Sequence, residues 1–270
     1  MLLAIDIGNS NTVLGLFNEG GERMADWRLT THRTQTVDEY GVLFRNLFSL
    51  RGIEVSAVNA IIIASVVPPL DSTLRKMCEI YFNQRPLFVE PGVKTGLSIR
   101  TDNPSEVGAD RIVNSVAAFH KYGGPCIVVD LGTATTFDVV SAQGEFLGGA
   151  IAPGLGISAE ALFSHAARLM RVDIRRPAKV IGSNTIDNLQ SGLFYGYLGL
   201  VDGILERILK ELGEEVRVVA TGGLARQIAQ DSRFITTVDD WLTLEGLLLV
   251  YGRNKVASKH ARKEHPAKEA

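Results

Sequence analysis

The sequence predicts a duplicated α/β protein with two lobes. Two short segments carry the same pattern, because residues 5–12 read IDIGNSNT and residues 129–136 read VDLGTATT. The aspartates of the two segments stand 124 residues apart, and the same offset carries Gly20 onto Gly144. With 270 residues, the chain is long enough for two lobes that each bury a core. The repeated segment therefore favours two lobes over one large domain.

The first half is predicted to open with three antiparallel strands, because apolar runs alternate with turns rich in Gly and Asn. A segment with helical apolar spacing follows, and then a continuous apolar run of strand length that two prolines end. The expected strands are residues 2–7, 13–17, 24–30, 60–67 and 87–89, and the expected helices are 37–51, 70–82 and 112–119.

The second half is predicted to repeat this outline, with strands at 126–130, 136–140, 145–152 and 216–221 and a long helix at 189–212. Two three-stranded meanders, each followed by α/β elements, describe the duplicated ribonuclease-H-like architecture of the actin, sugar-kinase and chaperone-ATPase group. We expect an N-terminal lobe over 1–118 and a C-terminal lobe over 119–252. In such a design a nucleotide lies between hinged lobes, whose closure excludes water from a transferring phosphoryl group.

Composition excludes several other classes of protein. The net charge of −2 leaves no electrostatic footprint for nucleic acid. No apolar stretch approaches the roughly 20 residues of a membrane span, and the start of the chain lacks the basic region of a signal peptide. We therefore expect a cytoplasmic protein with neither a membrane nor a nucleic-acid partner. Residues 253–270 contain six Lys or Arg and two Glu, so we expect a basic, disordered tail.

Both repeated segments have the composition of a phosphate-binding loop. Glycine lets the backbone turn tightly and lets its N–H groups approach an oxyanion, while Asn, Ser and Thr side chains add donors. Asp6, at the end of a strand, could hold Mg²⁺ directly or through water. A hairpin turn with a local Asn or Asp hydrogen bond would explain one copy equally well. The second copy favours the phosphate-binding interpretation over that alternative.

A third candidate lies between the copies, where Asp110 and Arg111 stand at the start of a predicted helix. The pattern leaves two interpretations open. An aspartate there can simply favour the helix dipole, and an adjacent arginine can simply be solvated. Cys78 and Cys126 lack metal-ligand spacing and are expected to be buried, and no histidine has paired ligand spacing.

Four motifs in chain order now identify a family. The Asp-Ile-Gly-Asn start, the tetrad 108–111 (GADR), the loop 130–136 (DLGTATT) and the segment 148–154 (GGAIAPG) together resemble type III pantothenate kinase. The resemblance runs over roughly residues 1 to 250. It implies phosphorylation of pantothenate by ATP to 4′-phosphopantothenate and ADP, the first step of coenzyme A biosynthesis.

The resemblance also implies roles for individual residues. Asp110 would be the catalytic general base that takes the proton of the pantothenate hydroxyl. The implied ATP-binding residues are Asp6, Ile7, Gly8, Asn9, Ser10, Asn11, Thr12, Val13 and Thr133, with Mg²⁺ accompanying ATP. The implied pantothenate-binding residues are Gly108, Ala109, Asp110, Arg111 and Thr185. Asp130 would bind a monovalent cation, K⁺ or NH₄⁺, and the Gly222-Gly223 pair would lie at the adenosine.

Several alternatives stay open. Thr185 reads equally well as a helix N-cap, and Gly222-Gly223 as a plain strand-to-helix turn. The resemblance implies a homodimer whose second subunit contributes to the pantothenate pocket. Relatives often carry a tyrosine near positions 99–102, and this chain has none there. The competing functions are a sugar or acetate-type kinase of the same superfamily and a nucleotide-binding accessory protein without chemistry.

Overall fold

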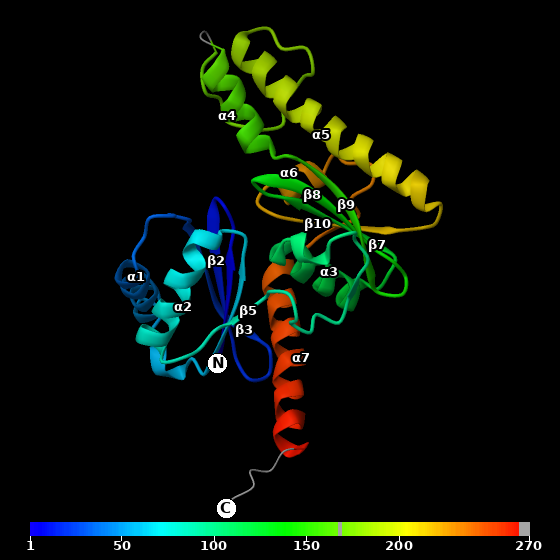
Figure 1. Cartoon of the computed structure of the whole chain (residues 1–270). Helices are drawn as coiled ribbons and strands as arrows, with labels where there is room; N and C mark the ends of the chain where they lie inside the picture. Colours follow the sequence, from blue (N-terminus) through cyan, green and yellow to red (C-terminus); the bar gives the residue numbers. More distant parts are fainter. Residues whose placement is uncertain (167–168, 265–270) are drawn as a thin grey trace, which may run out of the picture. The chain divides into compact units, whose positions relative to one another are not determined.

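The computed structural model describes residues 1–166 and 169–264, and the chain divides into two compact units (Figure 1). Unit 1 comprises Met1–Leu97, Asp102–Ala117 and the chain from Leu242 onward. Unit 2 comprises Ser98–Thr101 and Ala118–Trp241.

Unit 1 is built on a five-stranded sheet in the order β3-β2-β1-β4-β5. Its strands are β1 Leu2–Ile7, β2 Asn11–Phe17, β3 Arg23–Thr30, β4 Ala60–Ser65 and β5 Leu87–Phe88. The first three strands form an antiparallel meander, while β4 pairs in parallel with both β1 and β5. This is the predicted meander followed by a crossover strand.

Helices cover the sheet of unit 1. Successive side chains of β1 point to opposite faces of the sheet, so both faces carry apolar side chains that helices can bury. The helices are α1 Val37–Ser49, α2 Pro68–Phe82, α3 Ala109–Tyr122, which continues into unit 2, and α7 Leu242–Glu264. Leu3, Ile5 and Ile7 join a buried cluster with aromatic and aliphatic side chains of α1 and α2, which lie side by side in Figure 1. On the other face α7 packs against β1 and β2, and its Leu244 lies close to Gly15 of β2. The core of unit 1 is therefore the layer between α1, α2 and the sheet.

Unit 2 is built on a six-stranded sheet in the order β11-β10-β7-β8-β9-β6. Its strands are β6 Ser98–Ile99, β7 Cys126–Leu131, β8 Ala134–Val140, β9 Glu145–Pro153, β10 Arg217–Thr221 and β11 Thr237–Val238. Its helices besides the end of α3 are α4 Leu155–His165, α5 Thr185–Leu212 and α6 Ala225–Ala229. Phe194, Tyr197 and Val201 of α5 pack on apolar side chains of β7, β8 and β10.

The two sheets repeat one topology. The strand order is the same in both units if β1 to β5 are matched in sequence with β7, β8, β9, β10 and β11. Unit 2 has one additional strand, β6, at the edge beside β9. In both, two antiparallel hairpins precede a strand that returns in parallel beside the first. The predicted duplicated ribonuclease-H-like fold is confirmed.

The sequence offset of 124 holds only as far as the first loop. Ile7 pairs with Thr12 in unit 1, whereas Leu131 pairs with Thr135 in unit 2, so the loop of unit 2 is one residue shorter. The offset after the loop is therefore 123. Gly144 accordingly corresponds to Gly21 rather than Gly20, and both of these glycines have the positive φ of the left-handed region, +76° and +83°.

The end of the chain differs from the expected tail. Residues 253–264 belong to α7, which begins at Leu242 and packs against the sheet of unit 1 rather than completing the C-terminal lobe. The helix continues past Arg253, whose guanidinium donates to the carbonyl oxygen of Thr95 at 2.8 Å. Residues 265–270 of the expected tail lie outside the described residues.

Both cysteines are fully buried, as predicted, and neither forms a disulfide. Burial raises the pKa of each thiol, Cys78 and Cys126, to about 12, because a low-dielectric surrounding disfavours the thiolate. Both thiols therefore stay protonated at neutral pH. Among the described residues, no helix combines the length and the apolar character that crossing a membrane requires.

Candidate active site

The loop between β1 and β2 is the first repeated segment, and it presents polar residues to solvent. Asn9, Ser10 and Asn11 are exposed, whereas Ile7 and Thr12 on either side are buried. The amide of Gly8 donates to the carbonyl oxygen of Asn11 at 2.9 Å and closes a tight turn. An exposed turn of amide and hydroxyl side chains at the end of a buried strand is suited to contact phosphate oxygens.

Asp110 lies in the first turn of α3, as predicted, beside the buried Ala109. Its Oδ1 accepts a hydrogen bond from the amide of Arg111 at 2.8 Å. Burial raises the pKa of Asp110, and the amide and positive charge of Arg111 oppose that rise. A carboxyl group with a raised pKa is a stronger proton acceptor than an ordinary aspartate, which suits a general base.

Gly108 is needed for this arrangement of the aspartate. A Cβ atom added at Gly108 would lie 2.6 Å from Oδ1 of Asp110 and 3.5 Å from Cγ1 of Val66. Any side chain at this position would push the carboxylate away. The glycine of the tetrad therefore has a steric role that does not depend on substrate.

Val66 joins the two candidate segments of unit 1. Its amide donates to the carbonyl oxygen of Ile7 at 3.0 Å, and its side chain faces Gly108. The turn that carries Val66 is held by Ser65, whose hydroxyl donates to Oδ1 of Asp71 at 2.6 Å and accepts from the amide of Val67 at 3.2 Å. The structure thus brings the end of β1 and the tetrad together. Ser65, Val66 and Asp71 were not among the residues predicted from the sequence; the hydroxyl of Ser65 within the predicted strand 60–67 was the available signal.

In unit 2, Asp130 lies near the end of β7 and Thr133 lies in the loop between β7 and β8. The amide of Gly132 donates to the carbonyl oxygen of Ala134 at 3.0 Å, and that of Gly154 donates to the carbonyl oxygen of Thr133 at the same distance. A Cβ atom added at Gly154 would lie 2.3 Å from the carbonyl oxygen of Thr133. The glycine that ends the GGAIAPG segment therefore lets the chain pass directly against the loop.

Gly222 stands next to Asp130. An added Cβ atom would lie 2.5 Å from Oδ1 of Asp130 and 2.7 Å from the carbonyl carbon of Leu131, and φ of Gly222 is +94°. Only glycine fits here without strain, for reasons of both space and conformation. The Gly222-Gly223 pair does form a strand-to-helix turn, as one reading expected, and that turn abuts the Asp130 loop.

Tyr197 approaches the same loop from α5. Its hydroxyl is hydrogen-bonded to the hydroxyl of Thr135, and both residues are buried. Burial is the main cause of the raised pKa of Tyr197, and the negative charge of Asp130 adds to it. A neutral phenol therefore lies within electrostatic reach of the carboxylate.

Thr185 does not share this neighbourhood. It is exposed in the first turn of α5, twelve residues before Tyr197, which corresponds to roughly 18 Å along the helix. The N-cap reading of Thr185 is wrong, because Asn184 is the N-cap and its side chain accepts from the amide of Asp187 at 2.9 Å. Thr185 is consequently free of a capping role.

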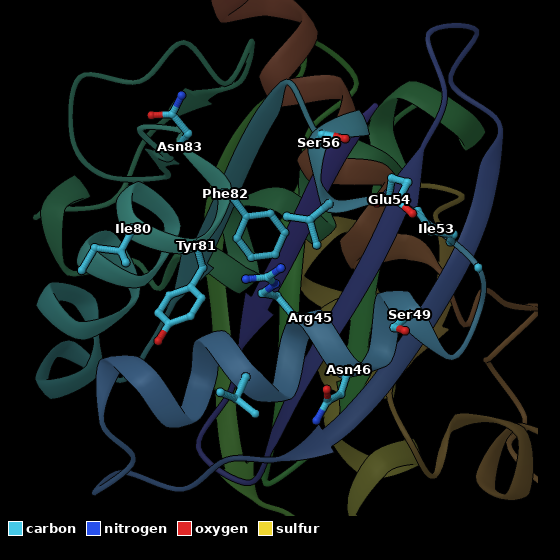
Figure 2. A pocket seen from close by; sticks show the side chains of 13 residues that line it. Arg45, Asn46, Ser49, Ile53, Glu54, Ser56, Ile80, Tyr81, Phe82 and Asn83 are labelled. Carbon is cyan, nitrogen blue, oxygen red and sulfur yellow. The ribbon is translucent and has the colours of Figure 1, made fainter.

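A cavity of about 780 Å³ lies elsewhere in unit 1, along α1 and α2 (Figure 2). Arg45, Ser49, Tyr81 and Asn83 are among the residues that line it. The lining includes none of the site residues predicted from the sequence. The cavity is therefore distinct from the predicted site residues of unit 1.

Metal-binding capacity rests on oxygen ligands. The described residues contain no group of three or more His, Cys, Asp or Glu side chains arranged to hold a metal ion. Mg²⁺ in nucleotide sites needs only one or two carboxylates, because phosphate oxygens and water complete its octahedron. Asp6 and Asp130 each offer a carboxylate, and carboxylate oxygens fit hard cations of this kind.

Comparisons with known proteins identify the family of this chain. A family model described as type III pantothenate kinase matches residues 2–207. The type III pantothenate kinase of Koribacter versatilis is 62% identical over 274 residues, covering 98% of this chain and 99% of that protein.

Solved structures at low identity show the fold. One is the activator of 2-hydroxyisocaproyl-CoA dehydratase from Clostridium difficile with bound ADPNP, with a TM-score of 0.53 and 13% identity over 100% of this chain and 99% of that chain. Another is the inorganic polyphosphate/ATP-glucomannokinase from Arthrobacter, with a TM-score of 0.50 and 10% identity over 95% and 98%. The match to the family model and the 62% identity over nearly the full length of both chains show that this chain belongs to the type III pantothenate kinase family.

Proposed function

We propose that this chain transfers the γ-phosphoryl group of ATP to the hydroxyl group of pantothenate, with Asp110 as the general base. The products are 4′-phosphopantothenate and ADP, and the reaction opens coenzyme A biosynthesis. Membership of the family over nearly the whole chain supports the reaction. The observation that carries the assignment of the base is a carboxyl group of raised pKa at the start of α3, coupled to the β1–β2 loop through Val66.

In the proposed step, the pantothenate oxygen attacks the γ-phosphorus while its proton passes to the carboxylate of Asp110. The bond from the γ-phosphorus to the bridging oxygen breaks, and ADP leaves with that electron pair. Phosphoryl transfer depends more on positioning and charge neutralisation than on the base, so the phosphate-binding loop matters as much as Asp110. The guanidinium of Arg111, which can bind an anion bidentately, is the proposed partner for oxygens of pantothenate or phosphate.

The nucleotide contacts are assigned by the same logic. Residues Asp6 to Val13 would line the phosphates, and Thr133 would meet the nucleotide from unit 2. Asp6 is the proposed ligand for Mg²⁺, which neutralises charge on the phosphate oxygens when bound with ATP. Asp130 is the proposed ligand of the monovalent cation. The absence of a side chain at Gly222 leaves the Asp130 carboxylate room beside that cation.

We also propose a homodimer. Six large apolar side chains of unit 2 are exposed between 38% and 88% on β9, on α4 and around the start of α5: Leu147, Ile151, Ile157, Leu162, Ile181 and Ile186. Exposed apolar surface of this kind supports a subunit interface. Thr185 stands beside Ile186, so a pantothenate contact from Thr185 is compatible with a pocket that two subunits complete.

The reaction is tested by an assay that couples ADP release to a signal. Purified protein with MgATP and K⁺ is expected to turn over pantothenate and to leave hexoses and acetate unphosphorylated. Hexose turnover without pantothenate turnover would establish the sugar-kinase alternative. ATP binding without ADP release from any of these substrates would establish a non-catalytic accessory protein.

Monovalent cations give a second test. We expect turnover with K⁺ or NH₄⁺ and little with Na⁺ alone, because Na⁺ is smaller and holds its hydration shell more tightly. Asp130→Asn is expected to raise the K⁺ concentration needed for half-maximal activity. Equal rates in the three salts would remove the cation role from Asp130.

A further inference from the structure

The β1–β2 loop contains no positive charge of its own. Between Asp6 and Val13 the sequence has one aspartate and neither Lys nor Arg. Backbone amides and hydroxyls bind phosphate more weakly than a charge-assisted hydrogen bond does. The structure places a cation on this loop from another part of the chain, because Nη2 of Arg33 donates to Oδ1 of Asn9 at 2.7 Å.

The segment that carries Arg33 is fastened to the loop. It links β3 to α1, and its Thr31 amide donates to the carbonyl oxygen of Ser10 at 3.0 Å. The Thr31 hydroxyl donates to the carbonyl oxygen of Gly8 at 2.8 Å and lies 2.9 Å from the hydroxyl of the fully buried Thr12. These contacts tie the loop and the segment together independently of the arginine side chain.

The backbone directly before Arg33 is held as well. The carbonyl oxygen of His32 accepts from the buried Tyr40 hydroxyl at 3.3 Å and from the amide of Gln35 at the same distance. Arg33 thus projects from an anchored turn. The placement of its guanidinium follows from the fold of unit 1.

The guanidinium keeps donors available for a ligand. The Arg33 side chain is exposed, and no carboxylate in the described part of the chain forms a salt bridge with it. Asn9 accepts one of its five N–H groups, which leaves the planar fork able to bind an anion. Asn9, Ser10 and Asn11 are exposed on the same loop, so an anion bound there meets neutral donors and this cation together.

We infer that Arg33 is a phosphate-binding residue of the nucleotide site, supplying the positive charge that the β1–β2 loop lacks. The inference rests on the proposed function for its ligand, the triphosphate of ATP. It assigns Arg33 to binding and charge neutralisation, while the proton transfer stays with Asp110.

The test compares Arg33→Gln and Arg33→Lys with Arg45→Gln, which removes another exposed arginine of unit 1 on the α1–α2 cavity. Binding of MgATP, MgADP and adenosine is measured by calorimetry without pantothenate, and the KM values of both substrates are measured by ADP release. Arg33→Gln is expected to weaken MgATP binding and to raise the KM for ATP by about tenfold or more. Adenosine binding and the KM for pantothenate should stay within about twofold of the wild type.

Arg33→Lys should recover part of the loss, because lysine keeps the charge but not the fork. Asn9→Ala should give a smaller loss than Arg33→Gln, because it frees the guanidinium without removing it. MgATP affinity in Arg33→Gln equal to that in Arg45→Gln would overturn the inference. An equal loss of affinity for adenosine and for MgATP in Arg33→Gln would also overturn the inference, because that result indicates a distorted loop.

The calorimetric comparison separates this inference from the proposed reaction. Wild-type protein that binds MgATP but does not phosphorylate pantothenate would refute the reaction alone. A selective loss of triphosphate affinity in Arg33→Gln would still support the inference in that case.

Discussion

Asp110→Asn is expected to lower kcat by roughly 100-fold or more while leaving MgATP affinity unchanged, since removing a positioned general base has an effect of this size. Asparagine has nearly the shape of aspartate and can still accept the hydrogen bond from the Arg111 amide, but it cannot accept a proton. Single-turnover measurements at saturating ATP and pantothenate would isolate the loss in the chemical step. Calorimetric titration with MgATP would verify that binding is retained.

The pH profile distinguishes loss of the base from loss of structure. The pKa of Asp110 is raised in the folded protein, so kcat/KM of the wild type should rise with pH through a midpoint above that of an ordinary aspartate and then level off. Asp110→Asn should lack this ascending limb. Burial disfavours the ionised carboxylate, so a neutral side chain removes an unfavourable charge above the unfolded pKa, and the melting temperature should not fall.

Asp26→Asn is a suitable control, because it removes a carboxylate from β3 that contacts Arg23 instead of the site. It should retain wild-type kcat and the ascending limb. Full turnover in Asp110→Asn would exclude Asp110 as the base.

Gly222→Ala is expected to impair both folding and turnover. The new Cβ atom would lie within 2.8 Å of Oδ1 of Asp130 and of two backbone atoms of Leu131, at a φ of +94° that alanine rarely adopts. The free energy of unfolding should fall by about 1–3 kcal/mol, the cost of one strained backbone position. Because relief of the clash displaces Asp130, kcat should fall about tenfold or more, and activation should need more K⁺.

Gly223→Ala is the matched control for this variant. No heavy atom outside the neighbouring residues lies within 4 Å of a Cβ atom built at Gly223, and its φ is outside the left-handed region. Chemical denaturation and K⁺ titration of both variants would test the difference. Equal stability and equal K⁺ response in the two alanine variants would contradict the steric role assigned to Gly222.

The sequence predicted the repeated fold well because most strands carry their own signal, although the two-residue strands β6 and β11 were not predicted. Apolar runs such as 60–67 are bounded by prolines or by turns rich in glycine, so local pattern and final structure agree. The strand order then follows from the hairpins and the returning parallel strand. The one-residue difference between the two loops left no such signal, because hairpin register depends on hydrogen bonds between strands.

The end of the chain illustrates what local pattern could not supply. Positive charge after Arg253 favoured a solvated tail, yet α7 continues through this region. Gly246 offers no side chain, so α7 approaches α3 so closely that an added Cβ would lie 2.0 Å from the carbonyl oxygen of Val113. This contact joins segments more than 100 residues apart in sequence, and a local pattern of about ten residues does not reveal such a contact.

The site was predictable only in part for the same reason. Asp6, Asp110 and Asp130 stand out as carboxylates at element ends, and a resemblance supplied their roles. Arg33, Val66 and Asp71 reach the site through contacts across the fold of unit 1, and each looks ordinary in its own sequence neighbourhood. Residues of this kind are recognised only in the three-dimensional structure.

The packing of α7 on β1 also fixes the order in which the protein can be completed during synthesis. The strands of unit 1 are synthesised before unit 2, but the helix that covers one face of their sheet is synthesised after it. Unit 2 is finished once Trp241 has emerged, so the half that starts first closes last. Until then Gly15 and its neighbours on β1 and β2 present an uncovered face, which places the nascent N-terminal unit among the states that chaperones protect.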